Sequence, residues 1–311
     1  MSTLTATVPA ISHGPITLKG SYGDWRDELA ASGYAVIREA IPRERAVQYQ
    51  RKALDWLTSF GTPLDLGDPR TWTTENLPVQ SKLNTFDNYC AVHEKFMWDA
   101  RTEPGVVDAF AKVWGTDELL VSFDSLNVTL PNRKDRPARA PWPHVDQSPL
   151  KRGVYCVQGI INLSPAGPED GSLMCLPRSN ALFDEFFDTQ TRPESWEEKD
   201  WRRFSVEEMK WWAIKGLRPV KVEAQPGDLI LWDSRTVHWG RTYGEERPLE
   251  EKRRVFSVYG ATTHWAHDNI FLRPKLAHLP DGSLDPRNRD EPLERPELSS
   301  KLLKLAGIEP Y

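Results

Sequence analysis

Three residues of this sequence have side chains and a spacing that suit a metal site. His144 and Asp146 lie two positions apart in Pro141–Ser148, so on a β-strand both side chains would project from one face. His238, far along the chain, is the candidate for a second imidazole. Two imidazoles and one carboxylate bind one face of a metal ion and leave the opposite positions open, which suits non-haem Fe(II) and O2 chemistry.

The His-x-Asp tripeptide alone is weak evidence for a metal, because it occurs by chance in many proteins. Its context favours the metal hypothesis: a proline-containing loop at 131–141 precedes it, and His238 follows the apolar run Leu229–Trp232. The alternative is that these histidines are ordinary polar residues at strand ends. A second group, His264 and His267, follows the last expected core strand, and we expect it to make surface or lid contacts.

The composition is that of a globular protein and excludes several partners. Hydrophobic residues make up 39% and charged residues 27% of the 311 residues. A net charge of −5 arises from 40 basic and 45 acidic residues without a long block of one sign, which argues against a nucleic-acid partner. No apolar run approaches the roughly 20 residues of a membrane span, and no signal peptide is apparent. The three cysteines lack CxxC spacing, so we expect reduced thiols and a cytoplasmic location.

Helices dominate the first part of the chain, residues 20–115. Apolar residues at three-to-four spacing predict three helices, and a β-branched run predicts one strand. The helices are expected at 22–31, after Pro42 and at 104–115, and the strand at 34–37. Residues 60–100 are rich in Pro, Gly, Asn and aromatic residues, so we expect a long irregular segment that forms part of a pocket wall.

Short strands with turn signals follow and predict a mainly β fold with flanking helices, a double-stranded β-helix (jelly roll, cupin-like) core. The expected strands are 119–130, the segment that carries His144, 154–163, 172–176, 220–223, 229–232 and 255–259. We expect a single domain over 1–311 with its core at 119–265, an insertion at 183–215 over one end of the sheet, and a C-terminal extension at 266–311 with a helix at 297–305.

An ordered series of motifs resembles the phytanoyl-CoA dioxygenase family over about residues 25–265. The motifs are Pro143–Gln147, Gln158–Leu163, Glu169–Leu173, Leu176–Asn180, and Gly227–Arg235 with His238. The resemblance implies a double-stranded β-helix, Fe(II) bound by His144, Asp146 and His238, and 2-oxoglutarate as co-substrate. One departure lies at Pro177–Asn180, where the family often has Pro-Gly-Ser-His; we interpret that segment as a turn rather than a ligand set.

The resemblance also implies an arginine that binds the distal carboxylate of 2-oxoglutarate from the start of the strand after the second histidine. An arginine offers such a carboxylate a two-pronged partner. Arg253 matches the family's pattern best, whereas Arg254 would face the opposite side of the strand. Arg241 and Arg247, in the preceding loop, are weaker alternatives.

Four polar or aromatic residues are further candidates for this site. Ser257 would share a face with Arg253 and hydrogen-bond the same carboxylate, although a plain core serine fits equally well. Asn127 lies on the preceding strand, where similar enzymes often carry an amide that contacts 2-oxoglutarate; the alternative is an asparagine that satisfies backbone groups. Trp142 and Gln147 flank the ligands, and for Trp142 we favour simple core packing.

The resemblance implies a dioxygenase that oxidises a C–H bond of a small organic molecule by hydroxylation, desaturation or cyclisation, with release of succinate and CO2. Asp146 favours oxygenation, because related halogenases have a small residue at that place. No basic cluster stands beside a Gly-rich turn for CoA phosphates, so we expect a free small-molecule substrate. A homodimer is left open. The alternative function is a metal- or small-molecule-binding jelly-roll protein without oxygenase activity.

Overall fold

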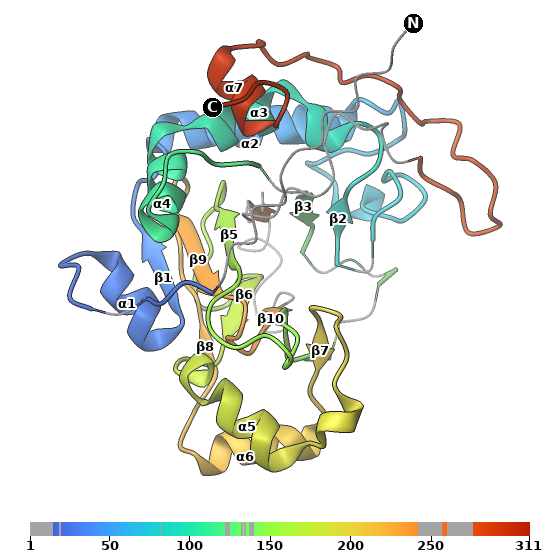
Figure 1. Ribbon diagram of the computed structural model, residues 1–311. Coiled ribbons are helices and arrows are strands. Elements are labelled where there is room, and N and C mark those ends of the chain that lie inside the picture. Colours follow the sequence, from blue (N-terminus) through green and yellow to red (C-terminus); the bar gives the residue numbers. More distant parts are fainter. Residues whose placement is uncertain are drawn as a thin grey trace, which may run out of the picture.

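The computed structural model describes residues 15–18, 20–81, 83–121, 125–131, 133, 135–136, 140–241, 257–259 and 276–311. Within these ranges, three antiparallel sheets lie between helices at two ends (Figure 1). The helices at one end are α2 (Arg43–Thr58) and α3 (Lys95–Thr102), with α4 (Pro104–Trp114) beside the strands, and those at the other end are α5 (Phe183–Gln190) and α6 (Val206–Ile214). None of the helices in the described ranges has the length and apolar character needed to cross a bilayer.

The first helix and the first strand confirm the sequence prediction. Helix α1 (Trp25–Ser32) begins at Asp24, whose side chain caps the first turn, and ends at Gly33 with a left-handed φ of 80°. A Cβ at Gly33 would lie 2.4 Å from Thr236 Oγ1, so the close approach of these two segments requires glycine. Strand β1 (Tyr34–Ile37) follows, and then α2.

A three-stranded sheet in the order β1–β9–β5 lies between helices α2, α3 and α4 on one face and the second sheet on the other. Its central strand β9 (Leu229–Asp233) pairs antiparallel with β5 (Val157–Ile161) and with β1. Leu231 packs in the cluster that includes α2, α3 and α4, whereas Ile230 and Trp232 pack toward the second sheet. Both faces of β9 are therefore buried, which explains its continuous apolar sequence.

The second sheet has five strands in the order β7–β4–β10–β6–β8. Their bounds are β4 (His144–Val145), β6 (Ser172–Cys175), β7 (Arg202–Arg203), β8 (Val220–Lys221) and β10 (His238–Arg241). A third sheet has the order β11–β3–β2, with β2 (Thr85–Phe86), β3 (Leu126–Thr129) and β11 (Ser257–Tyr259). The β-rich region and the absence of βαβ alternation in the described ranges agree with the predicted mainly β class.

Several predicted boundaries are wrong. The strand expected at 119–130 covers only Leu126–Thr129 among the described residues. Strand β10 was not predicted, because the sequence indicates only the apolar strand at 229–232 in this region. A turn closed by the Thr236 amide on the Asp233 carbonyl (2.8 Å) follows that strand, and β10 begins after it at His238.

The segment at 60–100 is less irregular than predicted. Helix α3 begins inside it, and two 3-10 turns, η1 (Pro69–Thr71) and η2 (Ala91–His93), lie within it. Its helical segments are too short for the apolar periodicity that identifies a helix from sequence.

Residues 183–215 form α5 and α6 with β7 between them, and two 3-10 turns, η3 (Ser179–Leu182) and η4 (Pro193–Ser195), flank α5. The two helices enclose their own apolar cluster, in which Phe186 stacks on Trp212 at 5.0 Å between ring centroids. Residues 183–215, predicted as an insertion over one end of the sheet, also contribute a strand to that sheet. This strand, β7, pairs with β4 and so supports the strand that carries His144.

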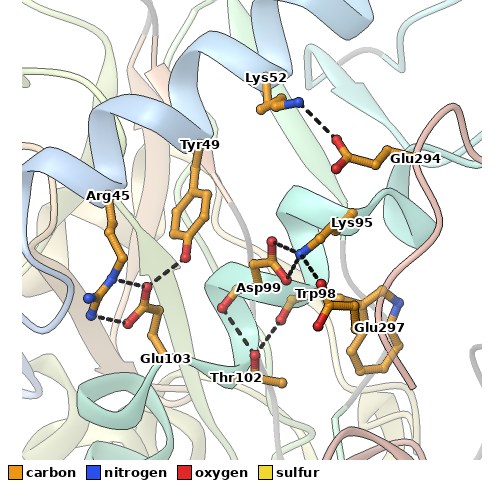
Figure 2. Close-up of polar contacts among 10 residues, drawn as sticks. All are labelled: Arg45, Tyr49, Lys52, Lys95, Trp98, Asp99, Thr102, Glu103, Glu294 and Glu297. Atoms are coloured by element: carbon orange, nitrogen blue, oxygen red, sulfur yellow. Dashed lines mark hydrogen bonds and ion pairs between the residues drawn. The ribbon is translucent and has the colours of Figure 1, made fainter. Parts of the chain in front are cut away.

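The C-terminal extension runs across α2 and α3, as Figure 2 shows. The ammonium of Lys52 pairs with Glu294 at 2.9 Å, and the Lys95 amide donates to the Glu294 carbonyl at 2.8 Å. Beneath these contacts, buried Glu103 accepts hydrogen bonds from Arg45 (2.7 Å) and from the Tyr49 hydroxyl (2.6 Å), which joins α2 to the start of α4 (Figure 2). Helix α7 (Ser300–Leu305) ends the extension.

A buried polar cluster joins the extension to the 60–100 segment. The Tyr89 hydroxyl donates to Asp285 at 2.6 Å, and Arg287 donates to the same carboxylate at 2.7 Å and to the Leu77 carbonyl at 3.1 Å. Burial would raise the pKa of Asp285, but the hydrogen bonds from Arg287 and Tyr89 outweigh it and lower the pKa to about 2.

This lowered pKa predicts a pH-dependent contribution to stability. Because the pKa of Asp285 in the folded chain lies below its ordinary 3.8, the ionised carboxylate stabilises the fold above about pH 4, and this stabilisation is lost as the pH falls toward about 2. We expect Asp285→Asn to lower the free energy of unfolding at pH 7 by about 2 kcal/mol and the difference from wild type to shrink on acidification. Urea titrations between about pH 7 and pH 3 measure it. Asp55→Asn, an exposed charge on α2, is the control, and a pH-independent deficit of Asp285→Asn would contradict the prediction.

Candidate metal centre

The three predicted metal ligands converge at one place. Among the described residues, one side-chain ligand atom from each of His144, Asp146 and His238 lies within 4.8 Å of the others. Asp146 Oδ2 is 3.2 Å from His238 Nε2 and 3.6 Å from His144 Nε2. The two imidazole ring centroids are 4.2 Å apart. The ligand atoms of the three side chains therefore face one another closely enough to share one ion.

Strand pairing places the two histidines. His238, the first residue of β10, stands directly opposite His144, the first residue of β4, so both side chains project from the same face of the sheet. Asp146 lies in a bend just after β4 rather than on the strand, which corrects the expectation that strand alternation positions it. Its amide donates to the Ser234 carbonyl at 2.9 Å, and this bond holds the bend against the turn that precedes β10.

Backbone carbonyls fix the tautomer of each imidazole. His144 Nδ1 lies 3.2 Å from the Trp142 carbonyl, and His238 Nδ1 lies 2.9 Å from the Thr236 carbonyl. A carbonyl oxygen only accepts, so each ring donates through Nδ1–H. In the neutral ring the lone pair is then on Nε2, which is the atom that faces Asp146. Such a backbone contact to the second nitrogen is the usual way in which a metal-binding histidine is oriented.

The charges at the site call for a cation. Burial and the neighbouring His238 lower the pKa of His144, so that ring is neutral near pH 7. Burial would raise the pKa of Asp146, but the two imidazoles beside it lower it, so the carboxylate is ionised. Two imidazole Nε2 atoms and one ionised carboxylate thus meet at one place. Nitrogen and oxygen donors arranged in this way fit a divalent transition metal.

Tryptophan side chains surround the triad. Trp142 stacks on the His144 ring at 4.2 Å between centroids and 9° between planes, and it is half-buried, so it contacts a ligand rather than packing only in the core. Trp201 lies 6.3 Å from the same ring with 41% of its surface exposed. Trp232 is 5.2 Å from the His238 ring. Trp201 was missed from sequence, because its place beside the site depends on β7 pairing with β4.

Gln147 and Asn127 both donate hydrogen bonds to backbone carbonyls, which for Asn127 is the alternative considered from sequence. The Gln147 amide is buried and donates to the Lys151 and Gly153 carbonyls, both at 3.0 Å, so it holds its own loop. Asn127 Nδ2 donates to the Leu83 carbonyl at 2.7 Å. The predicted contact of Asn127 with 2-oxoglutarate stays a prediction.

Of the other co-substrate candidates, Ser257 lies in β11 opposite Thr129 of β3. Arg253 and Arg254 lie outside the described residues, as do His264 and His267. The assignment of a 2-oxoglutarate-binding arginine therefore stays a prediction.

Gln158 is a site residue that lies within the motif Gln158–Leu163 and for which the sequence predicts no role. It lies on β5 opposite Trp232, and its Nε2 donates to Asp146 Oδ2 at 3.0 Å. The signal that could have identified it is a single amide within the otherwise apolar strand Val157–Ile161.

Solved structures of other proteins have the same fold. The chain matches SnoN, a non-heme alpha ketoglutarate dependent epimerase from nogalamycin biosynthesis, with a TM-score of 0.50 and 14% identity over 88% of this chain and 94% of SnoN. It matches EctD from S. alaskensis, solved with 2-oxoglutarate and 5-hydroxyectoine, with a TM-score of 0.50 and 16% identity over 88% of this chain and 84% of EctD. EvdMO1 matches with a TM-score of 0.50 and 18% identity over 76% of this chain, which spans only 48% of EvdMO1. At these identities the likeness establishes the fold.

Sequence comparison identifies the family. The family model of phytanoyl-CoA dioxygenase (PhyH) matches residues 29–243, and the chain belongs to this family. A curated relative, Ava biosynthesis cluster protein O of Aspergillus versicolor, is 42% identical over 81% of this chain and 88% of that protein. Iron and 2-oxoglutarate are the cofactor and the co-substrate of the family, and the predicted cofactors are thereby confirmed. The chain is accordingly an oxidoreductase of the oxygenase type.

The geometry predicts metal binding by the isolated chain. We expect the protein to bind one Fe(II) or Co(II), and His238→Ala to weaken binding by more than about 100-fold, because even changes behind the ligands typically cost about 10–100-fold. Anaerobic isothermal titration calorimetry measures the dissociation constants. His278→Ala, which removes an exposed histidine of the C-terminal extension, is the matched control. Equal affinities of the two variants would refute this centre.

Proposed function

We propose that this chain is an Fe(II)- and 2-oxoglutarate-dependent dioxygenase that oxidises a C–H bond of a small organic molecule and releases succinate and CO2. The observation that carries the proposal is the convergence of two imidazole Nε2 atoms and one carboxylate oxygen, with His144 and His238 paired across neighbouring strands. Membership of the phytanoyl-CoA dioxygenase family supports it.

We further propose that the sheets form one double-stranded β-helix within a single domain over 1–311. The strand order β4–β10–β6–β8 supplies one wall, and β1–β9–β5 lies across the interior from it. The third sheet, β11–β3–β2, continues the second wall, because β11 contacts β5. A jelly roll of this kind has its site between the two walls, where the apolar residues Ile230 and Trp232 exclude water.

In the proposed reaction, His144, Asp146 and His238 would hold the iron and leave the other positions for co-substrate and O2. Bound iron and 2-oxoglutarate supply the O2-dependent oxidation of the C–H bond. The protein's own residues orient and shield: the carbonyls of Trp142 and Thr236 hold the imidazoles, and Trp142 covers one face of His144. Asp146 occupies the position that is a small residue in related halogenases, which favours oxygenation.

We propose that 2-oxoglutarate binds against one face of the paired strands β3 and β11 through Arg253, with Ser257 and Asn127 as polar contacts. The backbone pairing supports a shared location, because Tyr259 stands opposite Asn127 and Ser257 opposite Thr129. Asn127 Oδ1 accepts from the Thr129 hydroxyl at 2.9 Å, so this side chain is already fixed in orientation.

The substrate that we propose is a free small molecule, and the reaction on it is hydroxylation, desaturation or cyclisation. The relatives support this breadth: SnoN is an epimerase from nogalamycin biosynthesis, and EctD is solved with 5-hydroxyectoine. A homodimer and a cytoplasmic location stay predictions. The second candidate function, a metal-binding jelly roll without turnover, differs in one measurable respect, which is the release of succinate.

Removal of the carboxylate ligand tests the proposed reaction. We expect Asp146→Ala to lower Fe(II)-dependent succinate release by more than about 1000-fold. Without the charged ligand, the protein would bind the metal more weakly and would no longer hold it in position. Succinate is measured by chromatography after incubation with Fe(II), ascorbate and 2-oxoglutarate. Asp281→Ala, an exposed aspartate of the C-terminal extension, is the control. Succinate release by Asp146→Ala at the wild-type rate would disprove the ligand assignment, and none by the wild type with a panel of substrates would favour the binding protein.

The arginine assignment has its own test. We expect Arg253→Gln to raise the KM for 2-oxoglutarate by about 10–100-fold, because a charge-assisted, two-pronged hydrogen bond to a carboxylate contributes about 1.5–3 kcal/mol. Arg254→Gln is the matched comparison, because strand alternation would place this neighbouring side chain on the opposite face, and it should change the KM by less than about threefold. The reverse pattern would assign the co-substrate to Arg254.

A further inference from the structure

We propose that Gln158 is a positioning residue of the metal centre: it holds the Asp146 carboxylate in the orientation that faces both imidazoles. This inference rests on the proposed function, because it assigns a role toward the proposed iron site. Gln158 does not belong to the ligand triad, and its effect on the metal would act through Asp146.

The hydrogen bond engages the oxygen that matters for the metal. Gln158 Nε2 lies 3.0 Å from Asp146 Oδ2, and the same Oδ2 lies 3.2 Å from His238 Nε2. The orientation of the amide follows from chemistry, because an ionised carboxylate only accepts and the Gln158 carbonyl oxygen cannot donate to it. The NH2 group must therefore face Asp146.

Asp146 needs such a partner because of where it lies in the chain. His144 is fixed by the pairing of β4 with β10 and by the Trp142 carbonyl, whereas Asp146 follows the end of β4. The bond from its amide to the Ser234 carbonyl holds its backbone but leaves its side-chain torsions free. Gln158, from a different sheet, supplies the side-chain contact that restricts them.

The surroundings of Gln158 argue against a role in packing alone. On its face of β5, the neighbours Ile160, Ile230 and Trp232 form an apolar cluster, and an amide in such a place loses free energy on burial unless it is hydrogen-bonded. Among the described residues its Oε1 is buried and has no hydrogen-bond partner, so only the end of the amide that faces Asp146 is satisfied. A glutamine serving the fold alone would be better replaced by an aliphatic residue.

Metal titration of Gln158→Met tests the proposal, because methionine has a similar length and volume but no donor. We expect the dissociation constant for Co(II), measured anaerobically without 2-oxoglutarate, to rise about 10–100-fold, and the visible d–d bands of the bound Co(II) to shift as the carboxylate reorients. Gln80→Met is the matched control: it removes another half-buried amide, whose Nε2 donates to the Val128 carbonyl at 2.9 Å, and should leave the Co(II) affinity unchanged.

Gln158→Asn extends the test in case the methionine variant does not fold. It retains the amide but withdraws the donor by one methylene, and we expect a loss of affinity in the same direction. Wild-type affinity and spectrum in whichever variant is folded by circular dichroism would overturn the role of Gln158. That result differs from a failure of the proposed function, in which the wild type would bind Co(II) but release no succinate, or would not bind Co(II) at all.

Discussion

The pairing of His238 with His144 across β10 and β4 is the constraint on which the site depends. It brings the two imidazoles to 4.2 Å between centroids and turns their Nε2 atoms toward one carboxylate oxygen. Burying a carboxylate and two imidazoles beside one another costs free energy, because each of these polar groups loses contact with water. The strands must therefore be held together by contacts elsewhere, so that the free energy lost at the centre is offset by the rest of the fold until a metal binds.

Those contacts come from segments far apart in the sequence. Strand β10 lies between β4 and β6, so its position is fixed from both sides. On its other side β4 pairs with β7, whose residues Arg202–Arg203 belong to the 183–215 insertion with its own aromatic cluster. The insertion thus supports the strand of the first histidine and also brings Trp201 near that ring. An element that could have been regarded as a cover over the sheet is part of the support of the metal site.

The sequence was sufficient for the parts of this structure that depend on local pattern or residue type. Helices α1 and α2 follow from their apolar spacing, and the three ligands follow from their types together with the order of the motifs. Features that depend on tertiary contacts were missed: the turn before β10, the short helix α3, and the bend that carries Asp146. Gln158 could not be assigned a role, because a hydrogen bond between different sheets leaves no spacing signal in the chain.

Strand β9 gives rigid support, whereas the neighbouring strand β5 carries a polar side chain, Gln158, that reaches the site. Along β9, Leu229–Trp232 bury apolar residues on both faces, and this strand cannot shift without disturbing the helices on one side and the interior on the other. Gln158 stands on the neighbouring strand directly opposite Trp232. Its amide therefore reaches Asp146 from the most constrained wall of the fold, whereas Asp146 itself lies in a bend. The hydrogen bond from Gln158 therefore restricts the orientation of the Asp146 side chain, which strand pairing does not hold in place.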